Sequence, residues 1–304
     1  MLVASASLWL SLGAVGALLG LRHLLHQGLA PESTVAGSNP ADHGLSAQAV
    51  QIPGAQGLNL FAWFLPALDP GPRPAVVLLH GWGGNASTLL LAAQELHRAG
   101  YAVLLLESRN HGRSDRDDHS SLPRFAEDLN SALDWLSGQA CIDAGCLMAM
   151  GHSVGGAAVL LSASRRHDLR AVISVSAFAH PEQVMRRWLA LRHVPYLPLG
   201  WLVNRYVERV IGARFDDIAP ITILTRVNCP VLLLHGRQDS MVPIDDARKL
   251  WQYRGKAPVT LIECDGTHEG FDDLEDVSRR ILAFLLAAIY TESTQTLPPP
   301  PENP

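Results

Sequence analysis

Short apolar runs alternate with amphipathic stretches along most of the chain, from Gln48 to about residue 177 and again from Val231. Continuous apolar runs predict strands that are buried on both faces, as in a parallel sheet. They occur at Ala75–His80, Ala102–Glu107, Cys146–Gly151, Ala171–Ala177, Val231–His235 and Val259–Glu263. Predicted helices follow at Ser87–Ala99, Arg124–Leu136, Gly155–Ala163 and Val277–Ile289. The alternation predicts an α/β fold, with a mostly parallel central sheet and helices on both faces.

Two segments depart from this rhythm. Gln48–Pro53 and Leu58–Ala67 predict an antiparallel pair of strands that opens the sheet, with Gly54 and Gly57 in the turn. Residues 178–226 contain no strand-like run and interleave aromatic residues with arginines, which predicts a short helical cap over the sheet. We therefore expect one α/β domain over residues 48–290, with its cap at about residues 178–226.

The N-terminus differs in kind from the rest of the chain. Residues 1–21 carry no charged side chain, and about 20 apolar residues suffice to span a bilayer as a helix. We therefore expect a transmembrane or signal-like segment at residues 1–22 and a linker at residues 23–47. Membrane anchoring by this single segment, in a bacterial inner membrane, is the predicted localisation. The proline-rich end, residues 291–304, predicts a disordered tail.

Flanking residues leave the fate of this segment open. Arg22 is the first cation and follows the apolar run, which favours a cytoplasmic domain by the positive-inside rule. A cleaved signal peptide is the alternative, with a secreted or periplasmic product, because residues 28–30 resemble a small-residue cleavage site. The absence of Lys or Arg before the apolar run speaks against cleavage. A buried core helix is a third interpretation.

Composition narrows the class of function. The 304 residues are 48% hydrophobic and carry a formal net charge of −5, and no basic block or stripe indicates a nucleic-acid partner. The four cysteines show neither C-x-x-C spacing nor zinc-ligand spacing with histidines. The sequence therefore implies no metal and no cofactor.

Ser153 is the candidate nucleophile. It lies in Gly151-His152-Ser153-Val154-Gly155, directly after a predicted strand and before an alanine-rich helix. The flanking glycines permit a sharp strand-to-helix turn that exposes the serine hydroxyl at the edge of the sheet. The alternative is an ordinary strand-to-helix turn in which the serine caps the helix.

A serine hydroxyl needs a base, and the base needs an acid that orients it. Asp239 and His268 each follow a predicted strand, so both are expected at the carboxyl edge of the sheet, where open α/β sheets place their sites. Asp245 and Asp246 are rival acids, but they follow Pro243 and are expected to begin a helix. Three other histidines are less suited as the base: His152 lies within the serine turn, His111 is expected to shape a turn, and His80 belongs to the loop expected to form the oxyanion hole.

Acyl transfer also needs donors for a developing oxyanion. His80-Gly81-Trp82-Gly83-Gly84 directly follows the first parallel strand, and its glycines let the backbone approach a substrate closely. We expect the backbone N–H groups of Trp82 and Val154 to form the oxyanion hole. The alternative is a flexible glycine turn.

With these motifs the chain resembles the α/β-hydrolase superfamily from about Gln48 to Tyr290. Four elements match in order: HGWGG, GHSVG, GRQDSMVP and Gly-Thr-His. The resemblance is strongest to bacterial esterase-like members with an N-terminal membrane segment and a short cap. It implies Ser153, Asp239 and His268 as the catalytic triad, in the order along the chain that is typical of the superfamily. Residues 108–115 resemble the superfamily's D-x-R-G-H-G-x-S turn, but Glu107 and Asn110 replace its usual Asp and Gly.

The implied activity is hydrolysis of a small-molecule carboxylic ester through an acyl-enzyme. Thioesterase, amidase, peptidase and acyltransferase activities use the same triad, and a non-catalytic binding protein on this fold is a further alternative. The sequence does not determine the substrate, the acyl chain length or the oligomeric state, because one fold hosts many chemistries.

Overall fold

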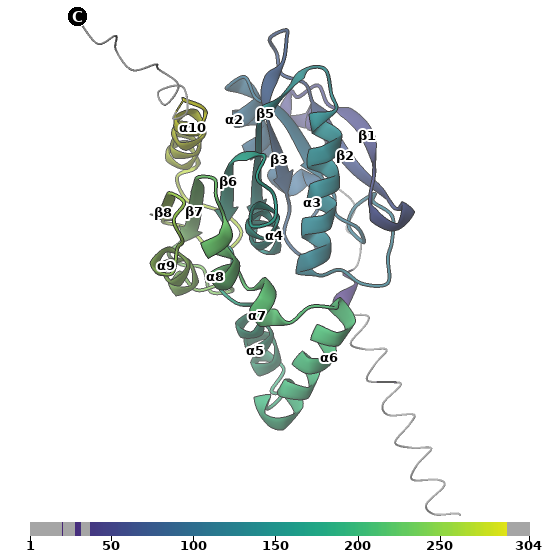
Figure 1. Ribbon diagram of the computed structural model, residues 1–304, viewed down its shortest axis with the longest axis vertical. Helices are drawn as coiled ribbons and strands as arrows, with labels where there is room; N and C mark the ends of the chain where they lie inside the picture. Colours follow the sequence, from purple (N-terminus) through teal and green to yellow (C-terminus); the bar gives the residue numbers. More distant parts are fainter. Residues whose placement is uncertain (1–19, 21–27, 32–36, 291–304) are drawn as a thin grey trace, which may run out of the picture.

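Eight strands form one mixed, mostly parallel sheet in the computed structural model, which describes residues 20, 28–31 and 37–290 (Figure 1). The strand order is β1-β2-β4-β3-β5-β6-β7-β8. Only the pairings of β1 with β2 and of β2 with β4 are antiparallel. The strands are β1 (Gln48–Pro53), β2 (Asn59–Leu65), β3 (Arg73–Leu79), β4 (Ala102–Leu106), β5 (Ile142–His152), β6 (Leu169–Val175), β7 (Val231–Gly236) and β8 (Val259–Cys264). The predicted fold class and the opening antiparallel pair are thus confirmed.

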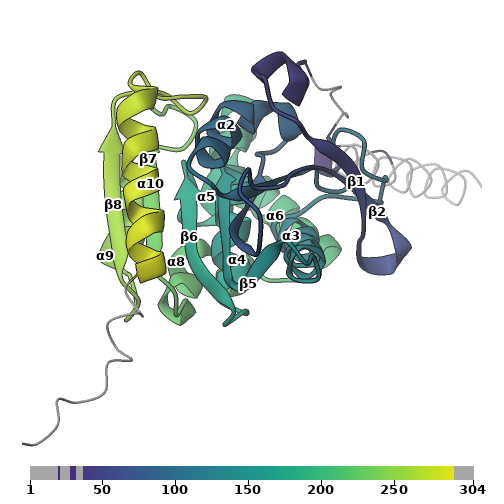
Figure 2. The ribbon, with the colours of Figure 1, turned by 90° about the horizontal axis from the view of Figure 1, so that it is seen from above.

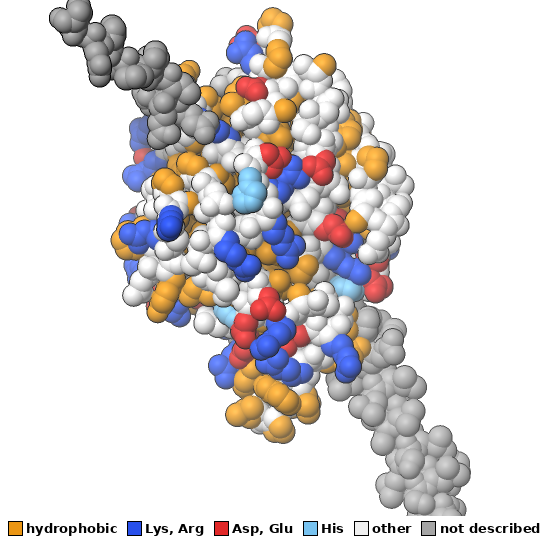
Figure 3. Space-filling model, in the orientation of Figure 1, with side chains coloured by type: hydrophobic (Ala, Val, Ile, Leu, Met, Phe, Trp, Pro, Cys, Tyr) orange, Lys and Arg blue, Asp and Glu red, His pale blue; other side chains and the backbone are white. Residues whose placement is uncertain are grey.

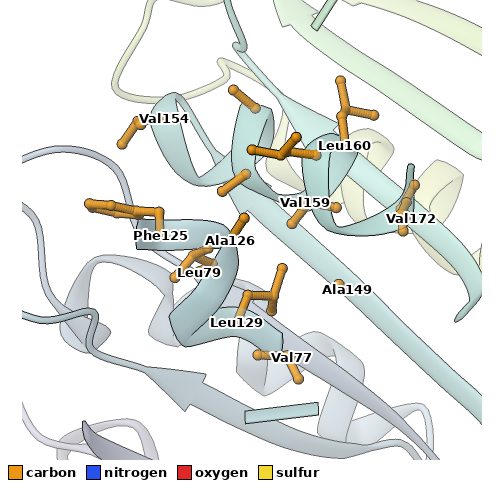
Figure 4. Packing of buried hydrophobic residues seen from close by; sticks show 14 of the residues in the cluster. Val77, Leu79, Phe125, Ala126, Leu129, Ala149, Val154, Val159, Leu160 and Val172 are labelled. Carbon is orange, nitrogen blue, oxygen red and sulfur yellow. The ribbon is translucent and has the colours of Figure 1, made fainter. Parts of the chain in front are cut away.

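The central strands are apolar on both faces because helices cover both. In β3, Val77 and Leu79 face one side, while Val76 and Leu78 face the other. Helices α3 (Leu122–Ser137) and α4 (Val154–Ala163) pack on the first face, and Figure 4 shows Phe125 and Leu129 of α3 beside Leu79 and Val77. Helices α2 (Leu90–Arg98) and α10 (Leu274–Tyr290) cover the second face (Figure 2).

Element ends follow local signals. The side chain of Ser121 accepts the backbone N–H of Arg124 and caps α3, with Pro123 in the first turn. The predicted helix at Ser87–Ala99 is two pieces, because the 3₁₀ turn η3 (Ala86–Leu89), capped by Asn85, precedes α2. Strand β5 begins four residues before its predicted start, since Asp143 and Gly145 interrupt the apolar run that would mark a strand.

The segment between β6 and β7 contains helices and helical turns, joined by short loops, and no strand. It contains α5 (Pro181–Leu191), the π-helical turn η4 (Tyr196–Gly200), α6 (Trp201–Ile211), α7 (Phe215–Ile218), α8 (Pro220–Ile223) and η5 (Leu224–Arg226). Helices α5 and α6 project from the carboxyl end of the sheet (Figure 1). By contrast, α8 packs on α4, and its Ile223 is buried in the main core. Helix α9 (Asp245–Gln252) follows β7.

The N-terminal predictions fall largely outside the described residues. This holds for the apolar segment at residues 1–22, apart from Gly20, and for the predicted tail at residues 291–304. In the described part of the chain, no helix is both long and apolar enough to cross a bilayer. Leu29 packs against the core, and its carbonyl oxygen accepts the N–H of Ser120. The 3₁₀ turn η1 (Pro40–His43) lies in the predicted linker and packs beside α2.

Candidate active site

Ser153 occupies the sharp turn between β5 and α4. Its backbone has φ 56° and ψ −119°, a region that non-glycine residues rarely adopt. The neighbouring strand holds the turn, because the N–H of Ser153 donates to the carbonyl of Val175 over 2.8 Å. Strain of this kind persists only where surrounding contacts fix it, and it is common at functional sites.

Close backbone packing around the turn requires glycine at two positions. A Cβ atom on Gly155 would lie 2.5 Å from the carbonyl oxygens of Leu79 and His80. A Cβ atom on Gly151 would lie 2.2 Å from the carbonyl oxygen of Gly155. The glycines of this motif therefore let α4 begin directly against the end of β3.

The three predicted triad residues meet at the carboxyl edge of the sheet. His268 Nε2 lies 3.1 Å from Ser153 Oγ, and His268 Nδ1 lies 2.7 Å from Asp239 Oδ2. With Nδ1–H donated to the carboxylate, Nε2 is free to accept the serine proton. The side chains follow β5, β7 and β8, so three separate strands position one hydrogen-bonded chain.

Asp239 is held as a carboxylate. Burial alone would raise its pKa, but hydrogen bonds from His235, His268 and the Val242 N–H hold the pKa of Asp239 well below its usual range. Its Oδ1 accepts the N–H groups of Met241 and Val242 at 2.9 and 2.7 Å. The carboxylate therefore keeps its charge while it orients His268.

His235 is a supporting residue that the sequence reasoning missed. Its Nε2 lies 2.7 Å from the carbonyl of Val242 and 3.3 Å from Asp239 Oδ2. It lies near the end of β7, four residues before Asp239, and that spacing was the only signal in the sequence.

The rival acids have other partners. Asp246 is buried and faces the guanidinium of Arg187 at 3.1 to 3.2 Å. Asp245 is exposed and pairs with Arg248. Both begin α9, as the sequence predicted.

His152 supports the loop that carries His268. Its Nε2 lies 2.8 Å from the His268 carbonyl oxygen, and the two imidazole rings are 4.9 Å apart. Burial lowers the pKa of His152, so the ring is neutral at neutral pH and donates one hydrogen bond. The histidine inside the serine motif thus links the serine turn to the loop after β8.

His80 orients the peptide that carries the Trp82 N–H. Its Nδ1 lies 2.7 Å from the Gly81 carbonyl oxygen, and its Nε2 accepts the Ser108 N–H over 3.2 Å. Burial lowers the pKa of His80 to about 3, which keeps the ring neutral. The trans peptide directs the Trp82 N–H opposite to the Gly81 carbonyl. Gly81 itself lies against the serine turn, since a Cβ atom there would be 3.2 Å from Ser153 Cβ.

His111 fixes the same loop from the other side. Its Nδ1 lies 2.9 Å from the Arg109 carbonyl oxygen, and its Nε2 accepts the Gly83 N–H over 3.1 Å. Burial lowers the pKa of His111, in keeping with a neutral ring. The Trp82 indole, which is 42% exposed, stacks on Phe125. The predicted turn residue thus also holds the HGWGG loop.

Glu107 and Asn110 differ from the Asp and Gly that are usual in the superfamily the chain resembles, and both belong to the segment that carries His111. The Glu107 carboxylate accepts the Arg113 N–H at 2.6 Å, and Asn110 adopts φ 66°. Arg109, which is fully buried, pairs with Asp128 of α3 through its side chain and its backbone N–H. Segment 107–114 is therefore anchored to α3 and carries His111.

A cavity of about 640 Å³ opens beside His268, between α2 and α10. His152, His268 and Phe271 line it together with apolar side chains of both helices. Within the described ranges, no group of three or more His, Cys, Asp or Glu side chains is arranged to hold a metal ion.

Comparisons with known proteins agree with this architecture. Residues 70–217 match the family described as serine aminopeptidase, S33. An uncharacterized protein of Mycobacterium tuberculosis H37Rv is 27% identical over 237 residues, which is 78% of this chain and 76% of the relative. The uncharacterized protein YfhR of Escherichia coli K12 is 25% identical over 273 residues, which is 86% of this chain and 87% of that protein.

Solved structures share the fold. The esterase Pf2001 of Pyrococcus furiosus superimposes with a TM-score of 0.71 at 19% identity, over 86% of this chain and 97% of the esterase. Est1E of Butyrivibrio proteoclasticus, solved with bound ferulic acid, gives a TM-score of 0.63 at 20% identity, over 80% of this chain and 100% of Est1E. The described residues therefore have the α/β fold of these esterase structures, and residues 70–217, just under half of the chain, match the family described as serine aminopeptidase, S33.

Proposed function

We propose that this protein is a serine hydrolase that cleaves carboxylic esters through an acyl-enzyme. One observation carries the proposal: Ser153, His268 and Asp239 form a continuous hydrogen-bonded chain at the carboxyl edge of the sheet. The strained backbone at Ser153 supports the same interpretation, as does the adjacent HGWGG loop, which the neutral ring of His80 orients. The esterases among the structural neighbours agree with it, since they have the same fold.

The geometry suits a two-step mechanism. Ser153 Oγ attacks the ester carbonyl carbon while His268 Nε2 takes the hydroxyl proton. His268 then gives this proton to the leaving alkoxide, and the alcohol departs from an acyl-Ser153 intermediate. A water attacks the acyl carbon and gives a proton to His268. Collapse of this second tetrahedral intermediate releases the acid, and the proton returns to Ser153 Oγ.

Two backbone donors are proposed for the oxyanion. Val154 is the first residue of α4, so its N–H belongs to the helix N-terminus, which favours negative charge. The Trp82 N–H lies on the peptide that His80 orients through the Gly81 carbonyl. Preorganised donors of this kind stabilise the transition state by about 3–4 kcal/mol each.

An ester panel tests the proposal. We expect the purified full-length chain to hydrolyse p-nitrophenyl esters, and Ser153→Ala to lower kcat by about 10⁴-fold or more. Ser137→Ala is the matched control, because Ser137 ends α3 and donates only to the Asp134 carbonyl. Folded wild-type protein that turns over no ester from acetate to palmitate would contradict the ester specificity. Equal rates in wild type and Ser153→Ala would remove Ser153 from the mechanism.

Hydrolysis of amides or peptides is the second candidate. The matched family is described as serine aminopeptidase, and the same triad cleaves amide bonds. An aminopeptidase must bind a free amino group, and Glu269 is an exposed carboxylate at the cavity beside His268. Higher kcat/KM on amino-acid p-nitroanilides than on p-nitrophenyl esters would favour this activity.

We also propose that the apolar segment at residues 1–21 anchors the protein in a membrane, with secretion after cleavage as the alternative. The support is its length and its lack of charge. Fractionation of the full chain and of a form that lacks residues 1–30 tests this. We expect the full chain with the membranes and the shortened form in larger part with the soluble fraction. A full-length chain that is wholly soluble contradicts the anchor.

A further inference from the structure

Large apolar side chains gather at the end of the projection that α5, η4 and α6 form. We call residues 191–202 the cap tip. Of the fifteen large hydrophobic side chains that are exposed in the described residues, five lie within these twelve positions: Leu191, Leu197, Leu199, Trp201 and Leu202. Figure 3 shows apolar atoms covering the end of this projection. Leu191 is 79% exposed and Leu197 is 71% exposed. A clustered apolar surface of this kind marks an interaction site, whereas single exposed side chains are ordinary.

Arginines flank the cap tip. Residues 181–214 contain six arginines and two glutamates, although the whole chain has a net charge of −5. Arg186 and Arg205 pair with these two glutamates, and Arg187 and Arg214 pair with aspartates outside the segment, so the excess of positive charge comes from Arg192 and Arg209. The guanidinium of Arg192 lies 3.7 Å from the Trp188 ring centre, and that of Arg186 lies 3.8 Å from the Tyr196 ring centre. Figure 3 shows basic and acidic side chains between the apolar end and the rest of the domain. Segments that lie in a membrane interface combine apolar residues with aromatic rings and cations. The cap tip and the residues that flank it have this composition.

The position of the cap tip agrees with a membrane partner. Residues 28–31 lie beside α6 in Figure 1, on the same side of the molecule as the cap, and Leu29 fixes them to the core. The uncharged segment at residues 1–21 ends seven residues before this point. Residues 28–31, which follow that segment in the sequence, therefore lie at the same end of the domain as the cap. The carboxyl edge of the sheet, with Ser153, lies at this end as well.

We propose that the cap tip inserts into the interfacial region of an anionic lipid bilayer. It would form a second membrane contact in addition to the proposed N-terminal anchor, with leucines and Trp201 among the acyl chains and arginines at the phosphate groups. Two contacts fix the orientation of the domain and turn the carboxyl edge of the sheet toward the bilayer. If the proposed function holds, the preferred substrates are apolar acyl esters that reside in the membrane.

Quenching of Trp201 by brominated lipid tests the contact without reference to activity. The full chain is reconstituted in vesicles of phosphatidylcholine and phosphatidylglycerol that are brominated near the headgroup end of their acyl chains. Trp9→Phe is the background, because Trp9 lies in the N-terminal apolar segment. We expect fractional quenching in this background, and its loss in Trp9→Phe/Trp201→Phe. Trp251→Phe is the matched control, since Trp251 of α9 is about as exposed as Trp201.

Two outcomes overturn the proposal. Fractional quenching that is unchanged by Trp201→Phe places the cap tip in water. A dimer in detergent that Leu199→Ser/Leu202→Ser dissociates, without lipid quenching of Trp201, assigns the surface to a second copy of the chain.

A second measurement tests the link to substrate. We expect Leu199→Ser/Leu202→Ser to lower turnover of a long-chain ester embedded in the vesicles severalfold and to leave turnover of p-nitrophenyl acetate unchanged. Leu286→Ser is the control, because Leu286 is equally exposed on α10. Wild-type protein that turns over neither ester contradicts the proposed function but not the membrane contact, because the quenching of Trp201 is measured without reference to activity. Equal turnover of the embedded ester in all three proteins contradicts the orienting role of the cap tip.

Discussion

Neutral histidines hold the backbone around Ser153. His80, His111 and His152 each have a nitrogen close to a carbonyl oxygen, and the Nε2 atoms of His80 and His111 also accept a backbone N–H. A protonated ring has no acceptor nitrogen, so charging His80 or His111 would break one of these contacts and leave a charge buried. The loops of the candidate site therefore depend on rings that stay neutral.

This dependence gives a pH prediction for His80. Its pKa is about 3 in the folded protein and 6.5 in the reference state, so the unfolded chain binds an extra proton between these values. Stability contributed by the neutral ring is complete above about pH 6.5 and is lost as the pH falls toward 3, by up to about 1.4 kcal/mol per pH unit. Urea denaturation should show a shallower loss between about pH 6 and 4 in His80→Asn than in wild type. Parallel slopes would mean that His80 is not held neutral.

The candidate triad was predictable from the sequence because each of its members lies shortly after a predicted strand, and because their order along the chain matches that of the superfamily the chain resembles. The supporting histidines were not, because their partners come from distant segments. His152 and the His268 carbonyl are 116 residues apart, and only the register of the sheet brings them together. His235 meets Asp239 within one loop, yet no pattern of apolar positions marks a buried imidazole.

At the scale of elements, the serine turn shows how a strand and a helix are joined at close range. Gly155 packs on the last carbonyl groups of β3, so α4 cannot begin there with a larger residue. The sequence predicted the strand, the turn and the helix. It did not predict the distances that make glycine obligatory, since these depend on the neighbouring strand.

A pair of glycine substitutions tests this packing. Gly155→Ala should lower the free energy of unfolding by about 1–3 kcal/mol, because the obstacle is backbone and cannot rotate away. Gly138→Ala is the control, since Gly138 follows α3 with φ −82° and its new Cβ would be 3.5 Å from the nearest atom. We expect Gly138→Ala to change stability little or to raise it slightly. Urea denaturation with intrinsic tryptophan fluorescence measures both, and equal effects would contradict the packing argument.

The insertion after β6 was predicted as a helical segment but not in its two parts. Helices α5 and α6 project, whereas α8 returns to the core through Ile223. Aromatic and arginine residues are interleaved over the projecting part, and the exposed side of each helix cannot be assigned until its neighbours are known. For this reason the apolar surface of the cap tip can be recognised only in the folded structure.

At the scale of the whole molecule, one ion pair links the projecting cap to the main body. Arg187 of α5 faces Asp246 of α9 with three oxygen–nitrogen distances of 3.1 to 3.2 Å. Asp246 is 1% exposed, so its carboxylate relies on this guanidinium and on its place in the first turn of α9. The cap is thereby tied to the helix that follows the Asp239 loop, and its position bears on access to Ser153.

Removing this link should loosen the cap and leave the sheet intact. Arg187→Ala leaves the buried Asp246 carboxylate without its cation, and we expect a stability loss of about 1–3 kcal/mol. Amide hydrogen exchange should quicken in α5 and α9 and stay unchanged in β3 and β5, because the two strands do not depend on the cap. Arg186→Ala, one position away, is the control, since Arg186 is exposed and lies 3.8 Å from Glu182. Exchange that quickens equally in the sheet would show that cap and sheet unfold as one cooperative unit, which would contradict this prediction.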